Sequence, residues 1–388
     1  MIRQKAQQYF LRDVLKIRNG RDHKHLKDGS IPVYGSGGIM RFVNQAIYTH
    51  QSILLPRKGT LDNIQFVKDP FWSVDTAFYT EIDKSKVAPY YLYYLLRQLD
   101  ISRLWTGTGV PSMTSEAYYN IKISLPDLPT QLRIAAILGS IDEKIELNRK
   151  KIVELEALAK TIYDYWFVQF DFPDKNGKPY KSSGGKMVWN EQLKREIPDE
   201  WEVGNLYDIA NFENGLACQK FRPKDNEASL PVIKIREMHD GINSDTERVS
   251  VNIPEKHRIA DGDLLFSWSA SLEAMIWSGG VGGLNQHIFK VTPRGEYTVE
   301  YVYWQLKTYI VTFAKMAEAR KTTMGHITTD HIKQSQVILP IGEILSHFAA
   351  TIRPIFDNRI DLKKEIRVLV ELRDTLLPLL MNGQVEVK

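Results

Sequence analysis

The histidines and the single cysteine are the residues whose chemistry most often builds a metal or catalytic site. His23 lies close to His25 and His326 lies close to His331, but neither pair has acidic residues converging on it in the sequence. A surface or loop role is therefore favoured over metal binding. Cys218 is the one cysteine, which excludes an internal disulfide and a cysteine-rich zinc site.

Sequence motifs of catalysis and of phosphate binding are missing as well. The chain has no Gly-x4-Gly-Lys-Ser/Thr phosphate loop, no His-Glu-x-x-His pair and no Gly-x-Ser-x-Gly elbow. The glycines of residues 34–38 do not open a helix, so they predict a turn rather than a cradle for a cofactor phosphate. We therefore expect no catalytic residue, no metal and no cofactor.

Five loops carry side chains of another kind. They mix basic, amide, hydroxyl and small residues, and they lie at 56–63, 107–114, 222–224, 267–269 and 320–326. Such side chains can reach DNA phosphates and base edges at the same time. Each loop taken alone is also typical of a solvated surface loop. The candidate DNA-contacting residues are Arg57, Lys58, Thr60, Asn63, Thr108, Ser112, Arg222, Lys224, Ser267, Ser269, Arg320, Lys321, Thr322 and His326.

A long helix predicted over residues 131–168 is the element most able to position these loops. Its apolar residues follow one another at alternating steps of four and three, which is the a/d pattern of a coiled coil. This seam contains Ile134, Leu138, Ile141, Ile145, Asn148, Ile152, Leu155, Ala159, Ile162 and Trp166. A helix of this length spans roughly 55 Å, which suggests a spacer between two bodies, although a long amphipathic core helix would show the same pattern.

The second half of the chain repeats the first. Tyr301 matches Tyr91 at an offset of 210 residues, Leu339 matches Leu125 at 214, and Asp357 matches Asp142 at 215. The loops described above fall at matching places in both halves, which favours a shared binding role. A second long helix offers Phe348, Ile352, Ile355, Leu362, Ile366, Leu369, Leu376 and Leu380. Pro354 should kink this helix near its start or mark its first turn.

The fold class expected from this duplication is α+β. Two α/β domains would be joined by a pair of long antiparallel, coiled-coil-like helices related by a pseudo-twofold axis. Asn148, the polar residue on the first seam, would fix the register of the pair. The expected boundaries are a first domain at 1–130, a central long helix at 131–172, a linker at 173–189, a second domain at 190–341 and a distal long helix at 342–388.

Composition sets wide limits on the function. The 388 residues are 43% hydrophobic and 25% charged, with a formal net charge of +4 and a pI of about 8.8. This balance is compatible with a nucleic-acid partner but does not require one. The first residues lack the apolar run of a signal peptide, and no apolar stretch approaches the roughly 20 residues that span a membrane, so we expect a cytoplasmic protein.

Several passages resemble one family. Residues 125–138, 141–149 and 165–171 are similar to the central conserved region of specificity subunits of type I restriction-modification systems, and residues 372–383 resemble their distal conserved region. Residues 197–203 look like the opening of their second target-recognition domain. The sequence departs from the pattern at 340–344, where the proline-glutamine turn of Pro129 and Gln131 has no clear counterpart. The start of the second long helix is therefore left open.

The resemblance implies a DNA reader that is not an enzyme. Each globular domain would read one half of a split, asymmetric DNA sequence, and the helix pair would set the gap between the halves. Two methyltransferase subunits, which bind S-adenosylmethionine themselves, would dock on the protein, and restriction and translocase subunits would join through the complex. Two readers one DNA turn apart need a spacer of about 34–36 Å, which the helix pair can supply.

Two other classes compete with this interpretation. A coiled-coil scaffold with two protein-binding domains would have the same helices and no DNA role, and salt-independent binding would favour it. An enzyme with unrecognised chemistry in one domain is the other alternative, but the sequence offers no nucleophile or metal set for it.

Overall fold

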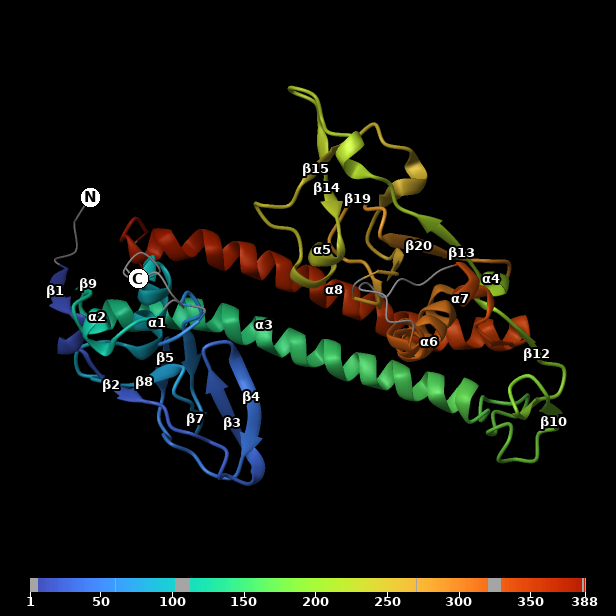
Figure 1. Ribbon diagram of the computed structural model, residues 1–388, viewed down its shortest axis with the longest axis horizontal. Coiled ribbons are helices and arrows are strands. Elements are labelled where there is room, and N and C mark those ends of the chain that lie inside the picture. The colour runs from blue at the N-terminus through green and yellow to red at the C-terminus, as the bar shows by residue number, and fades with distance from the viewer. Residues whose placement is uncertain are drawn as a thin grey trace. The chain divides into compact units, whose positions relative to one another are not determined.

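The computed structural model describes residues 6–59, 61–101, 112–269, 271–319, 329–385 and 387. The chain divides into two compact units (Figure 1). Unit 1 comprises Met1–Ile145 and Leu369–Lys388, and unit 2 comprises Glu146–Val368. Each unit combines helices with several small sheets, as the mixed helix-and-strand prediction requires.

The main sheet of unit 1 is antiparallel and has the strand order β2-β8-β5-β6. A second sheet has the order β4-β3-β7, in which β3 runs parallel to β7, and β1 pairs with β9. The strands are β1 (Gln7–Phe10), β2 (Leu15–Asn19), β3 (Asp28–Gly35), β4 (Gly38–Val43), β5 (Ser52–Pro56), β6 (Gln65–Val67), β7 (Trp72–Ser73), β8 (Ala77–Ile82) and β9 (Lys122–Leu125). Every residue of β5 is buried, since its apolar run crosses the core.

One short helix of unit 1, at Pro89–Arg97, packs against β5 and β6 of this main sheet. A 3-10 turn, η1 (Leu11–Asp13), follows β1, and α1 (Pro89–Arg97) follows β8. Pro89 lies in the first turn of α1, where backbone N–H groups have no partner within the helix, so the N–H that proline lacks is not needed. Four side chains of α1 are buried, namely Tyr91, Leu92, Tyr94 and Leu96. The short helix α2 (Ser115–Tyr119) is capped by Thr114, whose hydroxyl accepts from the Ala117 N–H at 3.1 Å.

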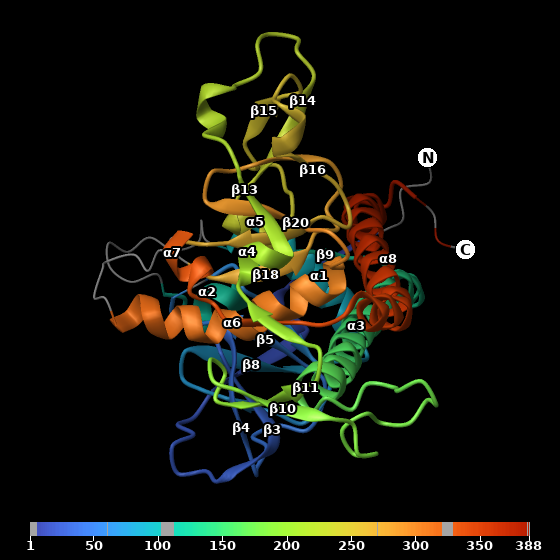
Figure 2. The ribbon, with the colours of Figure 1, turned by 90° about the vertical axis from the view of Figure 1, so that its right-hand side faces the viewer.

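Unit 2 has a main sheet of order β13-β20-β17-β18 and a second sheet of order β15-β14-β19-β16. In Figure 2 the strands β14 and β15 of the second sheet lie above β13 and β20 of the main sheet. The strands are β10 (Met187–Asn190), β11 (Arg195–Pro198), β12 (Glu202–Gly204), β13 (Ala210–Asn214), β14 (Ser229–Ile233), β15 (Arg248–Ser250), β16 (Arg258–Ile259), β17 (Leu264–Ser267), β18 (Glu273–Ile276), β19 (Gly282–Leu284), β20 (Ile288–Pro293) and β21 (Val337–Leu339). The helices other than the two long ones are α4 (Leu206–Ile209), η4 (Cys218–Lys220), α5 (Ile235–Asp240), η5 (Glu255–His257), α6 (Val299–Ala319) and α7 (Thr329–Lys333).

The two units repeat one topology. In the main sheets, the pair β2-β8 is equivalent to β13-β20, and the pair β8-β5 is equivalent to β20-β17. In the second sheets, β3 of unit 1 and β14 of unit 2 each have one antiparallel and one parallel neighbour. The pairs β1-β9 and β12-β21 close each unit in the same way. This shared strand order confirms the tandem duplication that the sequence predicted. The hairpin β10-β11 is an addition found in unit 2.

Each long helix contributes to both units. Helix α3 runs over Leu128–Tyr163 and continues in a π-helical turn, η3 (Asp164–Val168). It begins three residues before the predicted Gln131, because the Asp127 carboxylate accepts from the Thr130 N–H at 2.8 Å and caps the first turn. Hydrogen bonding to the Thr130 side chain, and then to its N–H, lowers the pKa of Asp127.

Helix α8 runs over Gly342–Met381. The prediction that Pro354 marks its first turn is wrong, because Pro354 lies a dozen residues inside the continuous helix. The segment at 173–189, predicted as a linker, is attached to unit 2 by its own hydrogen bonds. The Tyr180 N–H donates to the Phe172 carbonyl at 2.9 Å, and the two rings stack with centroids 4.7 Å apart.

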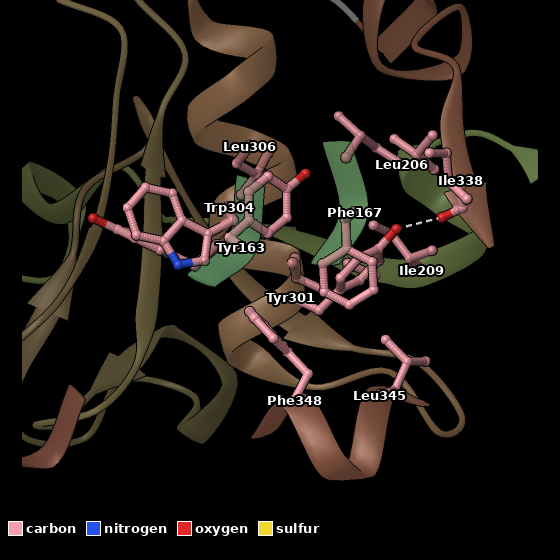
Figure 3. Close-up of a cluster of buried hydrophobic side chains, with 14 of the residues drawn as sticks. Tyr163, Phe167, Leu206, Ile209, Tyr301, Trp304, Leu306, Ile338, Leu345 and Phe348 are labelled. Carbon is pink, nitrogen blue, oxygen red and sulfur yellow. Dashed lines mark hydrogen bonds between the residues drawn. The ribbon is translucent and has the colours of Figure 1, made fainter. Parts of the chain in front are cut away.

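The core of unit 2 is mainly aromatic where α3 enters it (Figure 3). Tyr163 stacks on Trp304 at a centroid distance of 5.8 Å, and Phe167 contacts Phe348 edge-to-face at 4.8 Å. The Tyr301 hydroxyl donates to the Ile338 carbonyl at 2.5 Å, so this buried phenol keeps a partner. No helix within the described ranges is long and apolar enough to cross a membrane.

Candidate nucleic-acid interface

Two of the candidate loops in unit 1 lie side by side. Lys58 and Ser112 form a β-bridge, and the Met113 N–H donates to the Arg57 carbonyl at 2.9 Å. Lys58 and Ser112 are both exposed, and Arg57 is half-buried. The fold therefore brings together three of the candidate residues from segments that are far apart in the chain.

The turn between β3 and β4 joins the same group. The Asn63 side-chain amide donates to the Ser36 carbonyl at 2.7 Å, and the Ser36 N–H donates to the Thr76 hydroxyl at 3.2 Å. Gly38 has a φ of +118°, which favours glycine at this turn. The sequence predicted the turn but not its contact, because Asn63 lies 27 residues away. Asn63 thus holds this turn with one N–H of its side-chain amide, and its second N–H and its amide oxygen remain for another partner.

The two basic residues of this surface lack carboxylate partners in the part of unit 1 that the structure describes. Arg57 donates to the Asp75 carbonyl at 3.5 Å, and its guanidinium carbon lies 5.6 Å from the Phe78 ring centroid. Among the residues that the structure describes, neither Arg57 nor Lys58 forms an ion pair. An exposed cation without a partner, next to hydroxyl and amide groups, suits phosphate binding beside a base edge.

In unit 2 the turn between β17 and β18 uses its hydroxyls internally. Ser267 is fully buried, its hydroxyl accepts from the Glu273 N–H at 2.9 Å, and it donates to the Ser271 carbonyl. Ser269 is buried as well. In this conformation Ser267 stabilises the hairpin, and neither hydroxyl is presented to solvent. A polar residue type does not reveal whether its hydroxyl is already bonded, so the sequence could not show this.

Trp268, which is not among the predicted contact residues, is the large side chain of this turn. It is half-buried, its indole N–H donates to the Asn214 side-chain oxygen at 3.2 Å, and its ring lies 5.6 Å from that of His287. Two further candidates, Arg222 and Lys224, follow η4, and both are exposed. Neither has an ion-pair partner within the described part of unit 2.

Six candidates cannot be placed. They lie outside the described residues and are Thr60, Thr108, Arg320, Lys321, Thr322 and His326. Of the other histidines in close pairs, His331 is buried and His25 lies 5.9 Å from the ring of Trp72. In the ranges that the structure covers, no group of three or more His, Cys, Asp or Glu side chains could hold a metal ion.

Polar contacts connect α3 and α8 within each unit. In unit 2 the buried Asn148 amide donates to Glu365 at 2.8 Å, and Glu156 forms an ion pair with Arg359. Burial lowers the pKa of the Arg359 guanidinium to about 10. A residue later in α3 contacts a residue earlier in α8, so the two helices run antiparallel within unit 2.

Unit 1 contains a matching polar contact. Asp142 on α3 forms an ion pair with Arg373 on α8 at 3.1 Å, and it accepts hydrogen bonds from the hydroxyls of Tyr90 and Tyr94. The predicted helix-pair residues that are buried are Ile134, Leu138, Ile141, Ile145, Asn148, Trp166, Ile352 and Leu362. Those that are partly buried are Ile152, Leu155, Ile162, Ile366, Leu369 and Leu376.

A family model matches this chain in two stretches, at residues 4–157 and 198–372. Its description is type I restriction modification DNA specificity domain. The two matched stretches correspond to the two repeats seen in the strand order.

Two relatives are similar over most of their length. The type I restriction enzyme MjaIX specificity subunit of Methanocaldococcus jannaschii is 25% identical over 362 residues, covering 88% of this chain and 79% of the relative. The type I restriction enzyme HindI specificity subunit of Haemophilus influenzae is 25% identical over 359 residues, covering 77% and 78%.

One solved structure shares the fold. The crystal structure of the S subunit of a type I restriction-modification system from M. genitalium aligns with a TM-score of 0.64 at 16% identity. The alignment covers 98% of this chain and 97% of that one.

Proposed function

This chain belongs to the specificity subunits of type I restriction-modification systems, and we propose that each of its two globular domains reads one half of a bipartite DNA sequence. A role in DNA sequence specificity follows from the family itself. The division into two readers is our inference from the duplicated strand order, since each repeat carries its own sheet and its own candidate loops.

The observation that carries the proposal is the surface formed by residues 35–38, 57–59, 61–63 and 112–113 of unit 1. It presents two cations that have no carboxylate partner among the described residues, next to an exposed hydroxyl and an amide. Lysine and arginine supply affinity through phosphates, whereas the amide and hydroxyl groups can contact base edges. We assign this surface to the first half-site and the loops of unit 2, including Arg222 and Lys224, to the second.

The long helices would act as the spacer between the readers. Polar contacts link α3 and α8 within each unit, and those of unit 2 run antiparallel, which supports a coiled-coil-like pair. Such a pair would set the gap between the half-sites and provide docking surfaces for two methyltransferase subunits. Those subunits would bind S-adenosylmethionine and methylate the DNA, and restriction and translocase subunits would join the complex. This chain would itself catalyse nothing.

The test is to map methylated adenines in the genome of cells that express this chain with its cognate methyltransferase. We expect methylation at one bipartite sequence with a fixed gap. Residues 190–341 are then exchanged for the matching domain of a relative, and residues 1–130 are exchanged in a reciprocal variant. Each exchange should change one half-site and leave the other intact. If both half-sites change in each variant, or neither does, the two-reader proposal is wrong.

A further inference from the structure

A cavity of about 310 Å³ lies in unit 2 at the point where α3 passes into its π-helical turn. Its walls come from the end of α3, from η3, from α6, from the β10-β11 hairpin and from the residues at and before β21. Apolar side chains that line it include Phe167, Val168, Leu193 and Ile338. Among its lining residues that the structure describes, Arg195 is the one with a charged side chain. The cavity has room for roughly ten water molecules at about 30 Å³ each, so it can receive a long side chain of another molecule.

The half-buried guanidinium of Arg195 has no carboxylate partner within the described part of unit 2. It donates to the Phe167 carbonyl at 3.4 Å, and its central carbon lies 4.5 Å from the centroid of the Phe170 ring. Its Nε is buried and has no hydrogen-bond partner among the described residues. Burial lowers the pKa of this guanidinium, and the Tyr163 hydroxyl opposes the shift, whereas no described carboxylate does so. Because a guanidinium has five N–H groups, most of those of Arg195 remain for a ligand.

The carboxylates that are close to this cavity in the chain do not supply the missing charge. Asp164 begins η3, but it forms an ion pair with Lys160, one turn earlier on the same helix. Glu196 follows Arg195 in β11, and successive side chains of a strand point to opposite faces. Glu196 therefore lies on the other face of the hairpin. An anionic group of another molecule would complete the site.

Exposed apolar side chains on α3 and η3 lead to this cavity. Leu158 and Tyr165 are 49% and 37% exposed, and because they are seven residues apart they lie on one side of the helix. Val168 follows within the next turn, is 46% exposed and lines the cavity itself. Exposed apolar side chains that are grouped, unlike scattered ones, mark protein interaction surfaces. A protein that covers this part of α3 would bring its own side chains to the cavity.

We propose that the cavity binds an aspartate or glutamate side chain of the methyltransferase subunit that docks along α3, with Arg195 as its anchor. The inference rests on the proposed function, which places methyltransferase docking on the long helices, and adds one defined contact to it. A guanidinium can hold a carboxylate through two parallel hydrogen bonds, and the side chains of Thr312 and Gln336, which also line the cavity, can donate to it.

A protein carboxylate fits this cavity better than a phosphate of DNA does. Proteins neutralise the phosphates of a duplex with several lysines and arginines at once, whereas the cavity offers Arg195 alone among its described lining residues. An arginine in a recess between apolar side chains is instead typical of the residues that carry most of the binding energy of a protein–protein interface.

Substitution of Arg195 tests the site directly. Arg195→Met removes the charge and keeps an apolar stem, and Arg195→Lys keeps the charge but loses the planar fork that holds a carboxylate. Lys194→Met is the matched control, because Lys194 is the preceding residue of the same hairpin but is exposed and already paired with Glu191 at 2.8 Å. The affinity of each full-length variant for the methyltransferase subunit is measured by isothermal titration calorimetry.

We expect Arg195→Met to weaken methyltransferase binding by about 30-fold or more, because it leaves the partner's carboxylate buried and unpaired. Arg195→Lys should weaken it less, and Lys194→Met should stay within about twofold of the wild type. Binding by Arg195→Met within threefold of the wild type, or an equal loss in Lys194→Met, overturns the proposal. In the assembled complex, Arg195→Met should leave the salt dependence of DNA binding unchanged. A slope of log affinity against log salt that is shallower by about 0.9 would assign Arg195 to a DNA phosphate and would also overturn it.

A second measurement uses the wild-type chain and so does not depend on the variants folding. Butyrate carries a carboxylate on a short apolar stem, as glutamate does, and butyramide is its neutral counterpart. At constant ionic strength, butyrate should give a saturation-transfer NMR signal with the protein and should weaken methyltransferase binding, and butyramide should do neither. Equal behaviour of the two compounds would refute the site.

Two further outcomes separate the sources of the carboxylate and the two proposals. Butyrate binding with an unchanged affinity for the methyltransferase would assign the cavity to a free carboxylate and would overturn the partner assignment. A wild-type complex that assembles but methylates no bipartite sequence would refute the proposed function. The affinities of the Arg195 variants would decide the anchor in that case as well.

Discussion

Replacing Asp142 with Asn should destabilise unit 1 locally. The Asp142 carboxylate serves three donors, the hydroxyls of Tyr90 and Tyr94 and the Arg373 guanidinium, and its side chain is only 21% exposed. An amide replaces one acceptor oxygen with a donor and removes the charge that pairs with Arg373. Breaking a buried pair from one side costs roughly 3–5 kcal/mol. Because this pair retains some exposure to solvent, we expect about 3 kcal/mol, which corresponds to a roughly 150-fold change in a local opening equilibrium.

Hydrogen exchange followed by mass spectrometry would measure this change within the intact protein. Protection of the amides in α1 should fall by about two orders of magnitude in Asp142→Asn. The duplication supplies the control, since Asp357 occupies the equivalent position of the second repeat and is exposed. Asp357→Asn should alter protection by less than about 0.5 kcal/mol. Protection in α1 within threefold of the wild type, or an equal decrease in the control, would show that the Asp142 interactions do not stabilise unit 1.

Three further predictions address the interface, the spacer and the cysteine. Lys58→Ala should weaken binding to all DNA sequences and flatten the salt dependence, whereas an unchanged slope in an anisotropy titration would exclude a phosphate contact at Lys58. Four residues inserted between Lys150 and Lys151 lengthen α3 by about 6 Å. The gap between the two methylated half-sites should then widen by one or two base pairs, with both half-sites unchanged. Methylation at the original spacing would contradict the spacer role. Cys218 is buried, and burial raises its pKa to about 11. Its reaction with a disulfide reagent at pH 8 should therefore be roughly two hundredfold slower than that of an exposed thiol, and it should become fast in urea. Fast labelling of the folded protein would contradict the burial of Cys218.

The sequence was most informative where the structural signal is local. The alternating steps along residues 134–166 predicted α3, because apolar periodicity is a property of neighbouring residues. It could identify Asn148 as unusual but could not name its partner, since Glu365 lies 217 residues away and the contact depends on how two helices align. The position of Pro354 was misjudged because packing of the surrounding helix overrides the local preference against proline.

The candidate site was predictable in composition but not in arrangement. The loops containing Lys58 and Ser112 were both selected for their residue types, and the β-bridge that joins them depends on the complete sheet. The turn around Ser36 was missed as part of this surface because glycine and serine carry little chemical signal of their own.

The division of the chain into units has a consequence for its biosynthesis. Unit 2 is formed by one continuous stretch, whereas unit 1 needs both the first 145 residues and Leu369–Lys388. Leu380 is buried in the core of unit 1, and Arg373 pairs with Asp142 there. A ribosome must therefore translate past codon 380 before the earliest domain can acquire its last core side chain. Until then unit 2 can be complete while unit 1 still lacks part of its core, so a chain truncated before Leu369 would leave unit 1 unfinished and unit 2 intact.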